Sequence, residues 1–207
     1  MIQPEINDLQ KIKQQGIYKT APVSMEILSD IRTPIEVLKI LKNVSSHCYL
    51  LESISDNEKW GRYTSLGYDP SLEITCQNGH MKVGSLSFET TDPGKYIRQV
   101  IEEHKSPRFS YLPPFTGGLV LFDKVIAFDN FRQKIILIVN ISLENLETEY
   151  NGAILKLKQM ADLLTNGIAL PEQQGKCTSE FKPLFQREEY CSMVEKAKMP
   201  QSLLENM

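Results

Sequence analysis

The chain has 207 residues, 41% hydrophobic and 24% charged, so it can bury a core as one large domain or two small ones. Its net charge of −3 argues against a broad nucleic-acid or membrane-surface footprint. No stretch approaches the roughly 18 apolar residues needed to span a bilayer, and the N-terminus lacks the pattern of a secretory leader. We therefore expect a cytoplasmic protein with no nucleic-acid or membrane partner.

Cysteine and histidine residues are few, and their spacing matches no metal, redox or disulfide motif. The sequence therefore predicts no metal site, no histidine-based triad and no cofactor held by this chain. The residues concerned are Cys48, Cys76, Cys177, Cys191, His47, His80 and His104.

The first elements in chain order are a short helix over residues 6–16 and a strand over residues 18–28. Pro22 favours an edge or starting position in that strand, because proline cannot donate to a sheet ladder. Residues 33–36, Thr-Pro-Ile-Glu, predict a helix start: threonine caps, proline suits the first position, and glutamate completes a capping box. This helix is expected to run to about residue 42, and its apolar face should contain Ile35, Leu38 and Leu41, with Val37 and Ile40 beside them.

The next strand is an apolar run from Cys48 that ends on Glu52, followed by Ser53. A buried strand that delivers an acid and an alcohol at its end has the shape expected beside a small polar ligand. The more common alternative is a core strand that reaches solvent, with Glu52 solvated and Ser53 opening a turn. These residues alone favour the alternative.

Two hairpins are predicted further along the chain. The first lies between residues 72 and 83 and turns at Asn78-Gly79, a strong hairpin signal. The second joins a strand over residues 121–129 to a nearly continuous apolar strand over residues 134–141, which should lie centrally in a sheet.

Three more helices are predicted, from Asp92-Pro93 and over residues 143–165 and 187–198. The first of them should bury Tyr96, Ile97, Val100 and Ile101. Strands and helices do not alternate strictly, so the predicted fold class is α+β, with mainly antiparallel sheets and helices packed on the outside.

Residues 113–118, Pro-Pro-Phe-Thr-Gly-Gly, are a second stretch with unusual local chemistry. As a phosphate cradle the stretch is weak, because it has neither the dinucleotide-binding nor the P-loop glycine spacing. A glycine bend where one strand crosses another is the favoured interpretation.

Taken together and in order, five motifs resemble the N-terminal region of anthranilate synthase component I. The resemblance covers about residues 15–198 and implies a regulatory region over residues 1–170. Residues 171–207 would then be a linker and the truncated start of the chorismate-binding domain. The motifs are residues 49–53 (Tyr-Leu-Leu-Glu-Ser), 61–70, 114–118, 122–129 and 190–198.

The resemblance implies that the strand end at residues 51–53 forms part of a feedback site for L-tryptophan. Carried over by motif, Glu52 would face the ammonium of the effector, Ser53 would hydrogen-bond nearby, and Leu51 would form a wall. Arg62 is expected to meet the effector's carboxylate, on looser spacing. A carboxylate opposite an ammonium forms a charge-assisted hydrogen bond, which suits this assignment.

The chain also departs from the family pattern at two places. Family members continue after Lys198 with a domain that binds chorismate and Mg²⁺ and carries the catalytic residues, and they have an additional segment before Phe122. The resemblance therefore implies that this chain alone has no catalytic or metal-binding residues. A glutamine amidotransferase subunit, component II, is the implied partner of the full-length enzyme.

Alternatives remain open on the sequence. The sister enzyme aminodeoxychorismate synthase component I shares the architecture, although the intact Leu-Leu-Glu-Ser motif favours anthranilate synthase. The chain could also be a stand-alone tryptophan-binding module, or a non-functional product whose uncovered sheets would aggregate.

Overall fold

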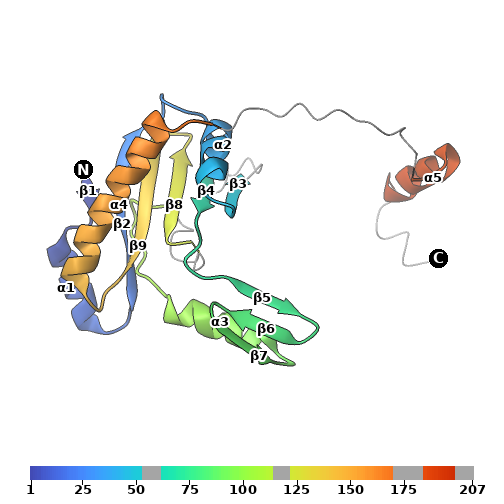
Figure 1. Ribbon diagram of the computed structural model, residues 1–207. Helices are drawn as coiled ribbons and strands as arrows, with labels where there is room; N and C mark the ends of the chain where they lie inside the picture. The colour runs from blue at the N-terminus through green and yellow to red at the C-terminus, as the bar shows by residue number, and fades with distance from the viewer. Residues whose placement is uncertain (53–61, 114–121, 170–183, 199–207) are drawn as a thin grey trace. The chain divides into compact units, whose positions relative to one another are not determined.

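The computed structural model describes residues 1–52, 62–113, 122–169 and 184–198 (Figure 1). The chain divides into two units, Met1–Leu170 and Pro171–Met207. The second unit contributes helix α5 (Arg187–Lys198), at the position predicted. All other helices and strands belong to the first unit.

A six-stranded antiparallel sheet is the main structure of the first unit. The central position predicted for the apolar strand β9 is confirmed. Pro22 lies beyond the stretch of β2 that β1 covers, so this part of β2 is an edge, as predicted. In spatial order the strands are β1 (Ile2–Gln3), β2 (Thr20–Leu28), β9 (Lys134–Ser142), β8 (Lys124–Asp129), β4 (Tyr63–Tyr68) and β3 (Cys48–Glu52).

Both faces of this sheet are apolar along β9, which explains why that strand is nearly continuous in hydrophobic residues. Ile135, Leu137 and Val139 point into the main core, which the helices cover. Ile136 and Ile138 point to the opposite face, into a smaller cluster with Leu112, Val125 and Ala127. The main core is covered by α1 (Ile6–Gln15), α2 (Pro34–Val44) and α4 (Leu146–Asn166), the last running across β9 and β2 (Figure 1).

The predicted start of α2 is confirmed in atomic detail. The Thr33 hydroxyl accepts a hydrogen bond from the Glu36 backbone N–H at 3.3 Å, and Glu36 accepts one from the Thr33 N–H at 2.9 Å. Leu41 is fully buried, but Ile35, predicted on the same apolar face, is 55% exposed. Ile35 lies in the first turn, whereas the buried residues of the helix begin at Val37.

A second, three-stranded sheet contains β5 (Ile74–Gln77), β6 (His80–Val83) and β7 (Leu86–Glu89). The hairpin predicted at Asn78-Gly79 is confirmed, with positive φ angles of 51° and 85° that suit these two residue types. The sequence analysis did not predict β7, which is short and has only one partly buried residue.

Helix α3 (Pro93–Glu103) buries less than predicted. Val100 is buried, and the ring of Tyr96 lies 4.6 Å from that of Phe88 on β7. However, Ile97 and Ile101 are 41% and 48% exposed, so their predicted burial is wrong. The described residues place no element over this side of the helix. The fold class itself, α+β with antiparallel sheets, is confirmed.

Candidate ligand-binding site

The strand end singled out in the sequence lies at an edge of the large sheet. Among the strands of the described residues, β3 pairs with β4 alone, so it is the last strand on that side of the sheet. Leu51 is 58% exposed and Glu52 is exposed as well. The prediction of a buried strand is therefore wrong, because an apolar run on an edge strand does not require burial on both sides.

The register of β3 on β4 places Leu51 and Glu52, two of the predicted ligand contacts, on opposite faces of the sheet. Glu52 lies opposite Thr64, and Leu51 lies opposite Ser65. Successive side chains of a strand point to opposite faces of the sheet. Glu52 therefore points to the face that the helices cover, and Leu51 points to the other face.

The Glu52 carboxylate has one hydrogen-bond partner among the described residues. Thr64, which is only 1% exposed, donates from Oγ1 to Glu52 Oε1 over a long 3.5 Å. The same hydroxyl accepts a hydrogen bond from Asn130 Nδ2 at 3.3 Å. Because Thr64 engages only one carboxylate oxygen, Glu52 keeps acceptor capacity for an ammonium group.

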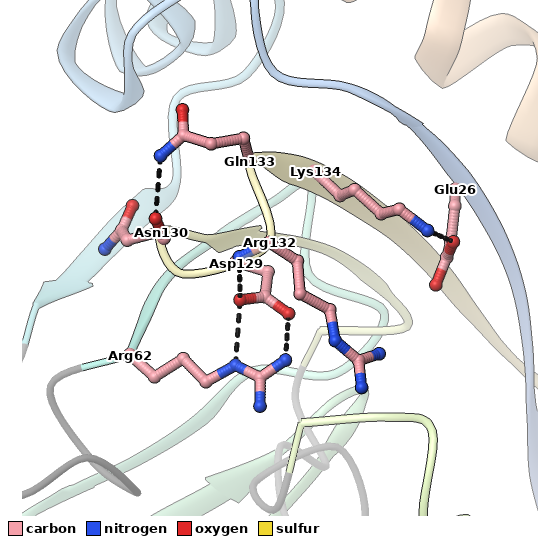
Figure 2. A network of polar contacts seen from close by, with 7 residues as sticks. All are labelled: Glu26, Arg62, Asp129, Asn130, Arg132, Gln133 and Lys134. Atoms are coloured by element: carbon pink, nitrogen blue, oxygen red, sulfur yellow. Dashed lines mark hydrogen bonds and ion pairs between the residues drawn. The ribbon is translucent and has the colours of Figure 1, made fainter.

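Arg62 is held by Asp129, a residue that the sequence analysis did not select (Figure 2). Arg62 Nε donates to Asp129 Oδ1 at 2.8 Å, and Nη2 donates to Oδ2, which makes the pair bidentate. Asp129 is 2% exposed, whereas the Arg62 side chain is 24% exposed. A buried carboxylate needs such a partner, since its charge would otherwise be costly.

The electrostatics of Asp129 follow from these contacts. Burial alone would raise its pKa, but hydrogen bonds from Arg62 and from the Arg132 backbone N–H, at 3.0 Å, outweigh burial. The pKa of Asp129 is therefore lowered from its ordinary value. The same pairing raises the pKa of Arg62, mainly through the hydrogen bond to Asp129.

Asp129 holds this position because it ends β8 and opens the turn to β9. Its side chain bonds the backbone N–H three residues on, as aspartate commonly does at the first position of a turn. The signal available in the sequence was the Asp129-Asn130 pair at the predicted hairpin turn, although nothing there named Arg62 as its partner.

Aromatic rings flank the Arg62 guanidinium. Its Cζ atom lies 4.9 Å from the centre of the Tyr63 ring and 5.6 Å from that of Phe131, both within cation–π range. Phe131 is 81% exposed. The turn thus combines a guanidinium with an open aromatic face, chemistry that suits a flat ligand carrying an anion.

The structure thus brings together some of the predicted site residues and separates others. Leu51 points to the same sheet face as Tyr63, which carries Arg62 on its ring. Glu52 points to the other face. Ser53 and the glycine stretch at residues 114–118 lie outside the described residues. Arg62 has its Nε and one terminal nitrogen bound to Asp129, and its Nη1 makes no hydrogen bond to another described residue.

A metal centre finds no support in the described residues. Within these ranges, no three His, Cys, Asp or Glu side chains are grouped so that they could hold a metal ion. The described residues therefore do not fit the Mg²⁺ site that the resemblance implies for the full-length enzyme. Among the helices of the described segments, none is long and apolar enough to cross a membrane.

By fold, then, the chain is an α+β protein with a partly exposed acid and a paired arginine at one end of its large sheet. By sequence, it is similar to curated proteins named anthranilate synthase component 1. The Acinetobacter calcoaceticus protein is 28% identical over 233 residues, which cover 93% of this chain and 46% of the relative. The Acetivibrio thermocellus protein is 28% identical over 176 residues, which cover 68% and 35%.

A third relative, from Pseudomonas putida, is 34% identical over 110 residues, which cover 50% of this chain and 22% of the relative. No family model matches the chain. The resemblance predicted from the motifs is therefore confirmed: the chain is similar to the N-terminal region of anthranilate synthase component I. It spans less than half the length of the curated relatives it matches.

The alignments also bear on the internal difference predicted before Phe122. The Acinetobacter alignment runs over 233 residues but covers 93% of 207, about 193 residues of this chain. About 40 positions of the alignment therefore have no residue of this chain. The position of the difference along the chain still rests on the motifs.

Proposed function

We propose that this chain is the N-terminal regulatory portion of an anthranilate synthase component I, which acts in tryptophan biosynthesis. In this proposal the segment around Leu51, Glu52 and Ser53, with Arg62, carries part of the feedback site for L-tryptophan. The observation that supports it most is the match of 93% of the chain to a protein named anthranilate synthase component 1. The printed names of the relatives favour this assignment over aminodeoxychorismate synthase.

The chemistry of the strand end is compatible with an amino-acid effector. Glu52 is exposed and can accept hydrogen bonds from an ammonium, while Leu51 offers an exposed apolar surface. A ligand-binding pocket usually encloses most of its ligand, and an exposed edge strand does not. We therefore propose that these 207 residues supply one wall of the site and bind tryptophan weakly on their own.

The activity of the parent enzyme is a second part of the proposal. It converts chorismate and an amino group to anthranilate and pyruvate, with component II supplying ammonia and Mg²⁺ bound by the full-length enzyme. We propose that these 207 residues do not catalyse this reaction alone, because none of them matches the catalytic or magnesium motifs. Anthranilate fluorescence, with chorismate, ammonium and Mg²⁺, is expected to stay at background. Turnover above background would refute this part.

Calorimetry tests the regulatory role and distinguishes it from the alternative, a stand-alone tryptophan-binding module. In our proposal L-tryptophan binds weakly, and Ser53→Phe abolishes the heat because the larger side chain fills the site. Micromolar binding that Ser53→Phe abolishes would instead favour a stand-alone tryptophan-binding module. The absence of any heat at millimolar tryptophan would remove the regulatory proposal.

A further inference from the structure

A second guanidinium lies beside the Arg62–Asp129 pair. Arg132 belongs to the turn between β8 and β9, and its backbone N–H donates to Asp129 Oδ1 at 3.0 Å. Figure 2 draws its side chain with that of Arg62, and the positive charges of both residues act on Tyr63, where they oppose the rise of its pKa. Within the described residues, the Arg132 guanidinium makes no hydrogen bond and no ion pair.

The charges of this cluster do not balance. Both oxygens of Asp129 accept hydrogen bonds from Arg62, and among the described residues no carboxylate is paired with the Arg132 guanidinium. Because Asp129 is 2% exposed, its side chain cannot rotate outward to serve Arg132 as well.

The other labelled side chains around the turn do not offset this excess. The other acid drawn in Figure 2, Glu26, is bound by Lys134 at 2.6 Å. The remaining turn residues, Asn130 and Gln133, are neutral, and Gln133 Nε2 donates a hydrogen bond to the Asn130 backbone carbonyl. Counted over the residues drawn in Figure 2, the turn therefore carries an excess positive charge, and Arg62 Nη1 and the Arg132 guanidinium have no hydrogen-bond partner among the described residues.

The same turn offers a flat apolar surface next to those donors. Phe131 stands between Asn130 and Arg132 in the sequence and is 81% exposed. Its ring lies 5.6 Å from Arg62 Cζ. Burial raises the pKa of Tyr63, and the positive charges of Arg62 and Arg132 both oppose this rise. Both cations thus act on the same phenol.

We infer that Arg132, together with the outer edge of Arg62, binds the carboxylate of an aromatic carboxylic acid whose ring lies against Phe131. For an amino acid such as tryptophan, this inference deepens the proposed function and rests on it. Glu52 lies at the same end of the sheet, since Thr64 contacts Glu52 and is bonded by Asn130 of this turn. Glu52 and Thr64 point to the helix-covered face, whereas Tyr63 and Asp129 point to the other face, so the inference concerns the carboxylate contact alone.

The test is a ligand-observed NMR titration of the whole 207-residue chain with three related probes. L-Tryptophan carries both charges, indole-3-propionate carries only the carboxylate, and tryptamine carries only the ammonium. Arg132→Gln is the informative variant, because Arg132 is exposed and supports no other side chain. Arg98→Gln is the matched control, an arginine 74% exposed on α3.

Loss of a charge-assisted contact at this exposed site should weaken both carboxylate probes by about five- to tenfold in Arg132→Gln. Tryptamine should bind the variant and the unaltered chain equally, and Arg98→Gln should change nothing. The inference is overturned if Arg132→Gln binds both carboxylate probes as tightly as the unaltered chain does, or if it weakens tryptamine equally.

The outcomes also separate this inference from the proposed function. If tryptophan binds without regard to Arg132, the feedback proposal survives and the carboxylate assignment is wrong. If indole-3-propionate binds in an Arg132-dependent way but tryptophan does not bind, the anion site survives and the feedback proposal is wrong. If no probe binds, both are wrong.

Discussion

Two regions at one end of the large sheet each contain a carboxylate, but one carboxylate is buried and paired and the other is exposed. At the β8–β9 turn, Asp129 is buried and fully engaged by Arg62 and a backbone N–H. At the end of β3, Glu52 is exposed and has one long hydrogen bond from Thr64. The first carboxylate is paired within the fold, whereas the second has no other hydrogen-bond partner among the described residues. Burial and pairing, rather than residue type, separate a structural acid from a candidate ligand contact.

Removing the partner of the buried acid should have the largest effect. Arg62→Ala leaves Asp129 buried without its bidentate partner, which should cost about 2–4 kcal/mol of unfolding free energy. Urea denaturation measures it. Arg98→Ala, which removes an exposed arginine 3.8 Å from Asp92, should stay within about 0.5 kcal/mol. Equal losses of unfolding free energy in the two variants would contradict the distinction between an arginine that pairs with a buried acid and one that pairs with an exposed acid.

Disturbing the packing of β3 on β4 should have the next largest effect on stability. Tyr49 lies across Gly67, and a Cβ atom at Gly67 would come within 2.2 Å of its ring. The ring also packs edge-on against Phe122 at 4.8 Å, so it cannot move freely. Gly67→Ala should therefore destabilise the chain by about 1–3 kcal/mol.

Gly152→Ala is the matched control for that substitution. Gly152 lies in α4, and nothing lies within 4 Å of the position of a new Cβ atom. Alanine there should stabilise the helix by about 0.5–1 kcal/mol. Thermal melts of both variants would show shifts in opposite directions, and destabilisation by both would contradict the packing argument.

The dependence of stability on pH should reveal the buried acid. The pKa of Asp129 is lowered in the folded chain, so its stabilisation is fully present above its unfolded pKa, about 3.9. The stabilisation is lost as the pH falls through the lower folded value. The stability difference between the unaltered chain and Asp129→Asn should therefore shrink below about pH 4. A difference that stays constant down to pH 2 would contradict this origin.

Much of the fold could be predicted from local sequence signals. The capping box at Thr33 and Glu36, the Asn78-Gly79 turn and the apolar run of β9 each depend on neighbouring residues, and each prediction is confirmed. The exposure of Ile97 and Ile101 could not be predicted, because it depends on what covers α3 rather than on helical spacing.

The candidate site was predicted less completely. Motif comparison selected Leu51, Glu52 and Arg62, but the register that places the first two on opposite faces is a long-range property. The pairing of Arg62 with Asp129 joins residues 67 positions apart, and no local pattern encodes it. The candidate residues could be selected from the sequence. Which charged residue pairs with which is set by the arrangement of the strands, so it could be seen only in the structure.

The central claim is that the exposed acid at the end of β3 contacts an amino-acid effector. Isothermal titration of the 207-residue chain with L-tryptophan, for the unaltered protein and for Glu52→Gln, tests it most directly. Glu52→Gln should leave the unfolding free energy within about 0.5 kcal/mol, because the side chain is exposed. The account predicts weak binding that Glu52→Gln reduces by about tenfold or more, because the ammonium loses its charged partner. Tryptophan binding of equal affinity in both proteins, or no binding to either, would contradict it.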